Sequence, residues 1–277
     1  MKKIIALAVA AVVAAPAMAD LTIGADARYQ LDNTGASANR VNVVIAGSTT
    51  AESGMFVSAK SVLNLTGTAA AAQDGDNNIV VGNAAANIAF GATESAGVYS
   101  KGTDAFRVRA AVEDGLLQER VQGRASSNII LNVTAVEGLT AQLSGNVEDD
   151  SFRTVLGYDM GVAAVKVGID RAGNDTTAVD AYQLMASTTV ADIALAASYA
   201  NMDFAAEDVT YVNLGASAMG FSLNWERAEG DGESNDGIYG AYTISNTAGL
   251  EGLTTTIGAG SADNADSKYG VRLGYAF

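Results

Sequence analysis

Apolar and polar residues alternate along this chain in segments of about ten residues, a pattern typical of β-strands with one apolar face. Clusters of Gly, Asp, Asn and Ser separate the segments. No stretch after residue 20 approaches the run of about 18 apolar residues that a membrane-spanning helix needs. The pattern therefore predicts an all-β chain. It is clearest in the last segment, where one face carries Tyr269, Val271, Leu273, Tyr275 and Phe277 and the other carries Gly270, Arg272, Gly274 and Ala276.

Three residue types are nearly or wholly absent. The single proline, Pro16, lies close to the N-terminus, and the chain has no cysteine and no histidine. Since proline deletes a donor from a β-ladder, its absence downstream favours one long hydrogen-bonded sheet. The lack of cysteine and histidine excludes disulfides, catalytic triads and histidine-ligated zinc. Carboxylates alone support glycoside hydrolysis, but no two are grouped distinctively, so an enzyme is the least expected class.

The first 19 residues have the composition of a secretory signal peptide. Two lysines precede an apolar core over residues 4–15, and an Ala-Met-Ala cleavage site follows at residues 17–19. We expect cleavage before Asp20 and export through the Sec pathway, because the apolar core is too short for a spanning helix. The mature chain then keeps 14 basic and 31 acidic side chains, a formal charge of −17. Nucleic acid is not an expected partner of so acidic a chain.

The alternating segments predict sixteen antiparallel strands. Short turns between them alternate with longer polar loops, which is the sidedness of an outer-membrane barrel. Hydrocarbon offers no hydrogen-bond partners, so the first and last strands are expected to pair and close the sheet. We therefore predict a transmembrane antiparallel up-and-down β-barrel over residues 20–277, wide enough to enclose water. The expected strands are residues 21–31, 40–50, 55–67, 78–84, 87–93, 127–135, 139–148, 152–160, 162–172, 180–190, 191–201, 209–219, 220–230, 236–245, 253–262 and 268–277.

Many aromatic residues fall near the ends of these strands, where the interfacial girdles of a membrane barrel place their rings. β propensity alone also favours aromatic residues in strands, and this explanation stays open for each position. The residues concerned are Tyr29, Phe152, Tyr158, Tyr182, Tyr199, Tyr211, Tyr269, Tyr275 and Phe277.

Four stretches of the chain resemble the Gram-negative general diffusion porins, in particular the alphaproteobacterial type. They are the opening DLTIGADARY (20–29), the hairpin VVIAGSTTAESGMFV (43–57), NIAFGATESA (87–96), which leads into a long insertion, and the closing YGVRLGYAF (269–277). The likeness covers the whole mature chain. It implies a water-filled channel in the outer membrane of a Gram-negative bacterium, through which small hydrophilic solutes and ions diffuse passively.

The resemblance implies further features. Such porins are homotrimers that pack through the first few strands and the last, and their third long loop folds inward as a constriction. Residues 94–126 occupy the place of that loop. Phe277 resembles the final aromatic residue that the barrel assembly machinery reads. The mature chain is short for the family and Arg107-Val-Arg109 alternates like a strand, so fourteen or eighteen strands stay open as alternatives.

The function of such a channel depends on charges at its narrowest section and needs no catalytic group. In the family, carboxylates on the inward loop face a basic cluster on the wall, and the transverse field between them favours polar solutes. The loop carboxylates of this chain are Glu94, Asp104, Glu113, Asp114 and Glu119. The wall bases, which lie on the polar face of their strands, are Arg28, Arg40, Lys60, Arg153, Lys166 and Arg272.

The predicted outer loops are rich in carboxylates, for example Asp149, Asp150 and the stretch 229–236. A negative vestibule concentrates cations, so we expect a weak cation preference that added salt screens. Loosely bound divalent cations such as calcium, bridging these loops to lipopolysaccharide, are a further hypothesis, although residues 231–236 do not have the spacing of a calcium loop. No other cofactor is expected. The expected partners are membrane lipid, lipopolysaccharide and other copies of the chain.

Three other interpretations stay open. A sugar-specific porin would line its channel with a row of aromatic residues, and we find no such row on the polar face. A structural or adhesive barrel would have a plugged lumen, for which residues 94–126 could serve. A secreted, soluble β-rich adhesin would instead turn its apolar faces inward.

Overall fold

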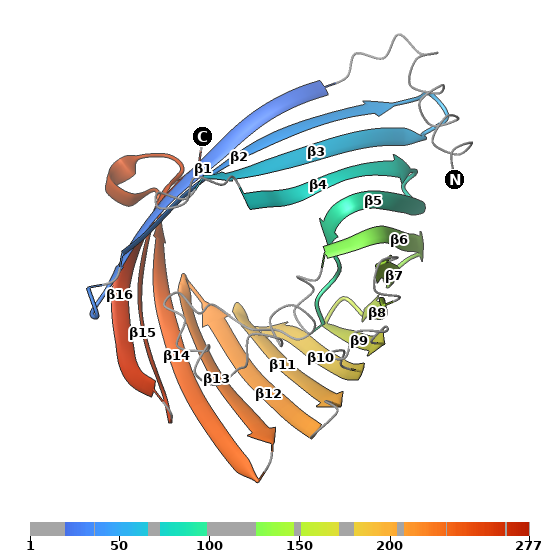
Figure 1. Cartoon of the computed structure of the whole chain (residues 1–277). Helices are drawn as coiled ribbons and strands as arrows, with labels where there is room; N and C mark the ends of the chain where they lie inside the picture. Colours follow the sequence, from blue (N-terminus) through green and yellow to red (C-terminus); the bar gives the residue numbers. More distant parts are fainter. Residues whose placement is uncertain are drawn as a thin grey trace.

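The alternating segments of the sequence form antiparallel strands that close into a barrel in the computed structural model of the chain (Figure 1). Residues 1–19, which hold the predicted signal peptide, lie outside the part of the chain that the structure describes. Phe277 and most of the predicted constriction loop lie outside it as well. The structure describes residues 20–35, 37–65, 73–98, 126–146, 151–171, 180–203, 208–230, 232–263 and 265–276.

The barrel has sixteen strands, as predicted. Among the described residues, one short 3-10 helix, η2 (Thr247–Gly249), lies between β14 and β15. The strands are β1 (Asp20–Asp32), β2 (Ser37–Thr50), β3 (Phe56–Leu65), β4 (Gln73–Gly82), β5 (Ala86–Glu94), β6 (Ser126–Val136), β7 (Leu139–Asn146), β8 (Ser151–Asp159), β9 (Ala163–Arg171), β10 (Asp180–Val190), β11 (Ile193–Asp203), β12 (Asp208–Ala218), β13 (Phe221–Gly230), β14 (Glu233–Ser245), β15 (Leu253–Ala262) and β16 (Ala265–Ala276).

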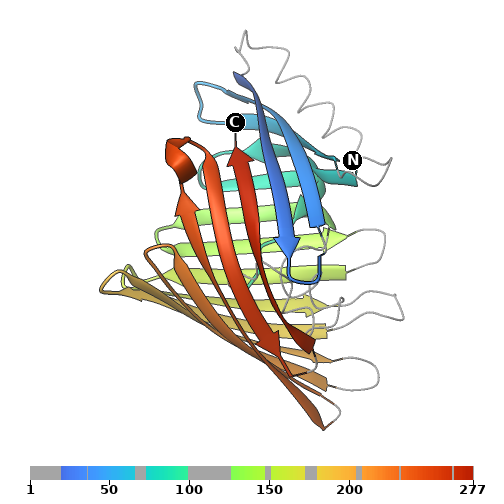
Figure 2. The same ribbon diagram turned by 90° about the vertical axis from the view of Figure 1, so that its left-hand side faces the viewer.

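Every strand pairs with its neighbours in the chain, and β1 also pairs with β16. The ladder between β1 and β16 runs from Asp26 opposite Ala276 to Asp32 opposite Gly270. Figure 2 shows β1 (blue) and β16 (red) side by side. Because sixteen strands close the sheet, the alternatives of fourteen or eighteen strands are wrong.

Most strand ends lie within about three residues of the predicted ends, a deviation common at strand boundaries. The larger difference is β4, which begins at Gln73 and not at residue 78. Similarly, β14 begins at Glu233 and β16 at Ala265, each three residues early. Because the first residues of these strands are mostly polar, the predicted strands begin too late. At the rim of a barrel a strand residue meets water on both faces, so a polar residue does not interrupt the ladder.

The two faces of the sheet differ in chemistry. Large apolar side chains on one face are exposed, among them Leu21, Ile23 and Leu223. Charged and small residues such as Asp26, Arg28 and Gly274 occupy the alternate positions, as predicted from the period of two. Among the described residues, no helix is long and apolar enough to cross a membrane.

The tight turns that join β10 to β11 and β12 to β13 have left-handed backbone conformations. In the first, Ala191 has φ 49° and Asp192 has φ 66°, between the paired residues Val190 and Ile193. Two positive φ angles define a type I′ hairpin turn, which Asn-Gly fits best because other side chains are strained there. The Ala-Asp turn is therefore a strained link in an otherwise regular hairpin.

Replacing this pair by Asn-Gly (Ala191→Asn with Asp192→Gly) is expected to stabilise the barrel by about 1 kcal/mol, because both residues then adopt their φ angles with little strain. The measurement is the urea midpoint of the refolded protein in detergent. Asp192→Ala is the control, since alanine keeps the strain and should give no gain. An unchanged midpoint for the Asn-Gly variant would contradict the assignment of strain to this turn.

Candidate functional site

The enclosed face of the barrel is the set of alternate strand positions opposite the exposed apolar residues. The chain that follows β5 turns to this side, inside the ring of strands (Figure 1). Val98 marks the contact, because a Cβ added to Gly168 of β9 would lie 2.8 Å from its Cγ2 atom. Gly168 shares its face with the charged Asp170. The polar face of the strands is therefore the lumen side, as the sequence analysis assumed.

Four of the predicted wall bases lie on neighbouring strands of this face. Arg28 of β1 and Arg40 of β2 are direct cross-strand partners. Arg272 of β16 lies opposite Gln30, one step along the enclosed face of β1 from Arg28. Lys60 of β3 lies opposite Ala46 of β2. The strand order β16-β1-β2-β3 places these bases on one continuous stretch of wall, with Lys60 opposite a residue six positions along β2 from Arg40. The basic wall is defined here as Arg28, Arg40, Lys60 and Arg272.

The end of β5 directs the following residues into the barrel. The ladder between β5 and β6 shifts register between Phe90 and Thr93, and Gly91 has φ +113°. A side chain on Gly91 would collide with the backbone oxygen of Asn77, so this position requires glycine. A bulge re-aims the strand that carries it. The segment 95–98 then continues along the inner wall.

Polar contacts fix this segment to β7. The backbone N–H of Ala96 donates to Gln142 Oε1 over 2.5 Å. Gln142 in turn donates to Asn132 Oδ1 (2.8 Å), and Asn132 donates to Asn87 Oδ1 (2.9 Å). The amide chain therefore connects segment 95–98 to β7, β6 and β5 on the enclosed face.

Arg153 of β8 holds the same segment from the other side. Its Nη1 donates to Ser95 Oγ at 3.0 Å, and its Nε pairs with Asp170 Oδ1. Asp170 Oδ2 accepts a hydrogen bond from Gln183 Nε2 at 2.5 Å. The Arg153 and Asp170 side chains are only 6% and 7% exposed. Arg153 was predicted as a pore-lining base; the structure places it in this buried network, which positions the inward segment.

Burial divides the enclosed face into two parts. Among the described residues, β4 to β15 each carry at least one buried residue on the enclosed face, whereas β16, β1, β2 and β3 carry none. The basic wall lies in the second part. Buried positions on the enclosed face are thus confined to β4 to β15, called here the covered side, and the wall from β16 to β3 stays accessible to water.

The covered side contains polar groups that sequence reasoning missed. Asn213 Nδ2 donates to the Tyr239 hydroxyl, which donates to Glu226 Oε2, both over 3.3 Å. Glu226 is fully buried, an unusual state for a carboxylate. Its position on the polar face of β13 was readable from the sequence, but burial inside a barrel leaves no periodic signal.

The covered side also carries an apolar cluster that includes Met202, Tyr211 and Tyr239. Tyr211 was predicted to belong to an interfacial girdle on the outer face. That prediction is wrong, because Tyr211 pairs with Ala200 on the enclosed face and is 2% exposed. Both tyrosines are on the lumen side, where the sequence analysis found no aromatic row, but their burial removes them from contact with passing solutes.

The remaining predicted site residues fall into two groups. Lys166 lies on the enclosed face of β9, exposed and opposite Gly157, away from the basic wall. Glu94 is the last residue of β5, and its side chain is not among those that the structure describes. Phe277, the predicted assembly signal, lies outside the described residues. So do the other predicted loop carboxylates, which are Asp104, Glu113, Asp114 and Glu119.

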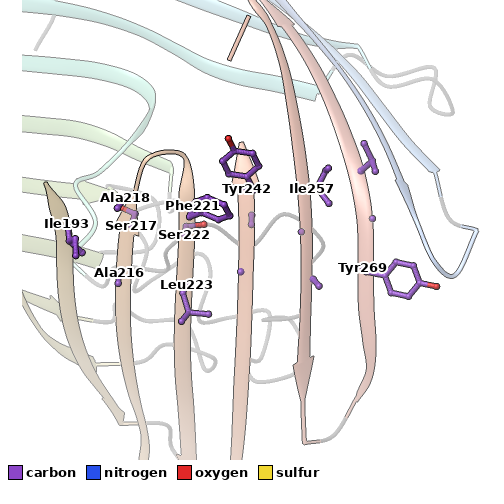
Figure 3. A pocket seen from close by; sticks show the side chains of 16 residues that line it. Ile193, Ala216, Ser217, Ala218, Phe221, Ser222, Leu223, Tyr242, Ile257 and Tyr269 are labelled. Carbon is purple, nitrogen blue, oxygen red and sulfur yellow. The ribbon is translucent and has the colours of Figure 1, made fainter. Parts of the chain in front are cut away.

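In the part of the chain that the structure describes, no group of three or more acidic side chains is placed to hold a metal ion. In the stretch considered above as a calcium loop, residues 233–236 belong to β14, and Asp236 lies opposite Arg227 with their charged atoms 3.7 Å apart. A hollow of about 710 Å³ lies on the outer face across β11 to β16 and is lined mostly by apolar side chains such as Leu223 and Ile257 (Figure 3). No charged residue is among the described residues that line this hollow, so it has no group that would bind a polar solute strongly.

No protein-family model matches the chain, and no curated protein matches it by sequence. Solved structures do match it. A loop-deletion mutant of OmpT, an outer membrane protein of Vibrio cholerae, has a TM-score of 0.74 at 13% identity, over 94% of this chain and 99% of that chain. Two mutants of Rhodopseudomonas blastica porin have TM-scores of 0.66 and 0.64 at 12% and 13% identity, over 93% of this chain and 100% of theirs. The chain therefore has the porin fold.

Removing the charge of Arg153 is expected to destabilise the barrel, because Asp170 is then left buried without its cation. For Arg153→Met we expect a loss of about 3 kcal/mol in the free energy of unfolding, measured by urea titration of the refolded protein. The double variant Arg153→Met with Asp170→Asn should lose less, since it removes both charges.

Arg171→Met is the matched control. Arg171 pairs with Asp180 at 2.6 Å, but both side chains are largely exposed at 47% and 32%. An exposed ion pair contributes less than about 1 kcal/mol, so this variant should unfold near the wild-type midpoint. Equal losses for Arg153→Met and Arg171→Met would contradict the proposed role of the buried pair.

Proposed function

We propose that this protein is a general diffusion porin, a water-filled channel through which small hydrophilic solutes and ions cross the outer membrane of a Gram-negative bacterium. The observation that carries the proposal is the reversed distribution of side chains. Large apolar residues such as Ile23 and Leu223 are exposed on the outer face, whereas Arg28, Arg40 and Arg272 face the enclosed side. This arrangement suits lipid outside and water inside.

The size of the barrel supports an open channel. Eight strands leave an interior that side chains fill, whereas sixteen strands enclose a lumen too wide for that. Segment 95–98 narrows this lumen on the β7 to β9 side, and the wall from β16 to β3 stays accessible to water. A structural barrel with a fully plugged lumen would have a covered wall all round.

The lining favours a general channel over a sugar-specific one. Stacking of sugar rings requires exposed aromatic faces along the path. Of the described aromatic residues on the enclosed face, Tyr211 and Tyr239 are buried at 2% exposure, and Phe56 stands alone at the first position of β3, beside the turn. Solutes are then selected by size and by the field at the narrowest section, through contacts with a charged wall.

Carboxylates at the rim that carries the longer loops support a weak cation preference. Asp203 of β11 lies directly opposite Asp180 of β10 and Asp208 of β12, so three carboxylates form a row across three strands. Asp203 and Asp208 are exposed. These positions have the parity of the outer face, but they lie at the rim. There the field of exposed carboxylates reaches the entrance within a Debye length of about 10 Å and raises the local cation concentration.

The same proposal includes the oligomeric state of the protein and the membrane components that surround it. We propose a homotrimer, contacts with membrane lipid and lipopolysaccharide through the exposed apolar face, and delivery by the Sec pathway and the barrel assembly machinery. Loosely bound divalent cations at the acidic rim belong to this proposal as well. Heat-modifiable migration on gels and cross-linking in detergent measure folding and trimer formation directly.

The central test is reconstitution of the purified protein in a planar bilayer. We expect stepwise conductance increments and, across a gradient near 0.1 M KCl, a reversal potential that shows preference for K⁺. Near 1 M salt the preference should decline, because the Debye length falls from about 10 Å to about 3 Å. Absence of steps from protein that is heat-modifiable would leave a plugged barrel as the better explanation.

The variant Asp203→Asn with Asp208→Asn tests the source of the cation preference. We expect a smaller reversal potential at low salt and no change near 1 M, because the lost attraction is screened there. Asn201→Gln, a neutral exchange on the same strand, is the control and should match the wild type. Anion preference of the wild type at low salt would refute the proposed role of the rim.

A further inference from the structure

The enclosed face of β9 to β13 carries small and hydroxyl-bearing residues in the half nearest the tight turns. Two rows of cross-strand partners cross these strands there. The first row consists of Ala164, Ser187, Ala196, Gly215 and Asn224, and the second of Thr189, Ala194, Ser217 and Ser222. All of these residues line a recess of about 530 Å³ on the lumen side of the wall, called here the hydroxyl recess.

The size of the side chains explains why the wall is hollow at this level. One step further from the turns, the next row includes Ser198, Asn213 and Glu226, all of which are buried. In the first row of the recess, neither Ala196 nor Gly215 has a side-chain atom beyond Cβ, and both are only half-buried. Within the covered side, this level therefore remains open to water.

Hydroxyl groups supply most of the polar lining of the recess. Ser217 and Ser222 are direct partners across β12 and β13, and Ser187 and Thr189 lie on the enclosed face of β10. A hydroxyl group can both donate and accept a hydrogen bond. This lining therefore complements the hydroxyl groups of a solute, which also act as both donor and acceptor.

The recess has little charge to offer an ion. Among the described residues that line it, Asp159 is the one charged residue, and it lies at the edge beside the turn between β8 and β9. Its Oδ1 already accepts a hydrogen bond from the Gly161 N–H at 2.7 Å. The recess thus suits an uncharged solute better than an anion or a cation.

A buried amide at the same place provides a second observation that points to a ligand. Asn224 is 2% exposed, and its Nδ2 has no hydrogen-bond partner, an unusual state for a buried polar atom. Its Oδ1 lies over Gly215, 2.6 Å from the position that a Cβ would take there. Rotation about the last side-chain bond exchanges these two atoms, so either one can be turned towards Gly215 and the recess. A hydroxyl group in the recess can therefore supply the partner that the amide lacks.

We propose that the hydroxyl recess is a subsite for an uncharged polyhydroxyl solute, that is, a sugar or a sugar alcohol. Its small residues let the solute approach the wall, and its hydroxyl and amide groups replace the water that the solute gives up. The inference rests on the proposed channel function and names one class of solute that pauses within the channel. The described lining has no aromatic ring for stacking, so binding is weak and the channel still passes other solutes.

The test uses sorbitol on single channels of the wild-type protein in a planar bilayer. Sorbitol is expected to lower the ion current in a saturable way, beyond the fall in conductivity measured for the bulk solution. Triethylene glycol dimethyl ether, which has no hydroxyl group, is the solute control, and its current should follow the bulk solution. A current that follows the bulk solution in sorbitol as well would overturn the subsite and leave the channel function intact.

The double variant Ser217→Ala with Ser222→Ala removes two hydroxyl groups from the recess. It should raise the half-saturating sorbitol concentration about fivefold, the effect of losing two hydrogen bonds between neutral groups. Ser48→Ala with Ser58→Ala is the matched control, because Ser48 and Ser58 are also cross-strand partners on the enclosed face near the tight turns, one exposed and one half-buried. Equal shifts for the two double variants would show a general effect of lumen hydroxyl groups and overturn the subsite.

A second pair of variants tests the space rather than the hydrogen bonds. Ala196→Leu fills the recess and should abolish the saturable response to sorbitol. Ala46→Leu adds the same volume to the enclosed face of β2, at another half-buried alanine near the tight turns, and should keep the response. A response that survives in Ala196→Leu would contradict the proposed location.

If the wild type forms no channel, saturation-transfer NMR of sorbitol gives an independent measurement on the barrel in a detergent without sugar head groups. Transfer that is lost in Ala196→Leu and persists in Ala46→Leu would support the subsite even though the channel proposal had failed. Heat-modifiable migration of each variant shows whether it has folded. Absence of transfer from the folded wild type to sorbitol would overturn the subsite.

Discussion

Pairing of β1 with β16 is the interaction on which the rest of this structure depends. All other strand pairs join chain neighbours, so each hairpin could form by itself, but only the last pair leaves no open edge. In hydrocarbon an open edge carries unsatisfied backbone groups, each costing several kcal/mol. Closure also fixes which way every side chain faces. Once the ladder is continuous, successive residues of a strand must face the enclosed space and the surroundings in turn. The chemistry of the lumen then follows from the parity of the sequence.

The lumen that results is asymmetric around its circumference. Segment 95–98 is held to β7 by Gln142 and to β8 by Arg153, and each strand from β4 to β15 carries buried residues on its enclosed face. Water access is left to the wall from β16 to β3, which carries the closely spaced arginines. One buried ion pair thus acts on the enclosed space at a distance, because it helps to set the position of the inward segment and hence which charged residues stay accessible to water.

The strands and the facing of their side chains could be predicted because both depend on a local period of two. Sixteen strands and the enclosed position of Arg28, Arg40, Lys60, Arg153, Lys166 and Arg272 followed from that period. The role of Arg153 could not be predicted, since it depends on Asp170 and Ser95, partners contributed by other segments. Tyr211 was misplaced because its position near a strand end was given more weight than its parity. The burial of Glu226 depends on packing across the lumen, which no local pattern records.

The strictly sequential order of the strands has a consequence for how the chain could be rearranged. Asp20 and Ala276, the ends of the described barrel, belong to adjacent strands, and both lie at the rim with the tight turns. No connection crosses the barrel from one strand to a distant one. A circularly permuted chain, joined between these ends and opened at the turn around Ala191, would keep every neighbour relation of the ladder. The pair formed by the first and last strands of the chain would then be β11 and β10. The gene order thus decides which strand comes first, and the barrel architecture does not.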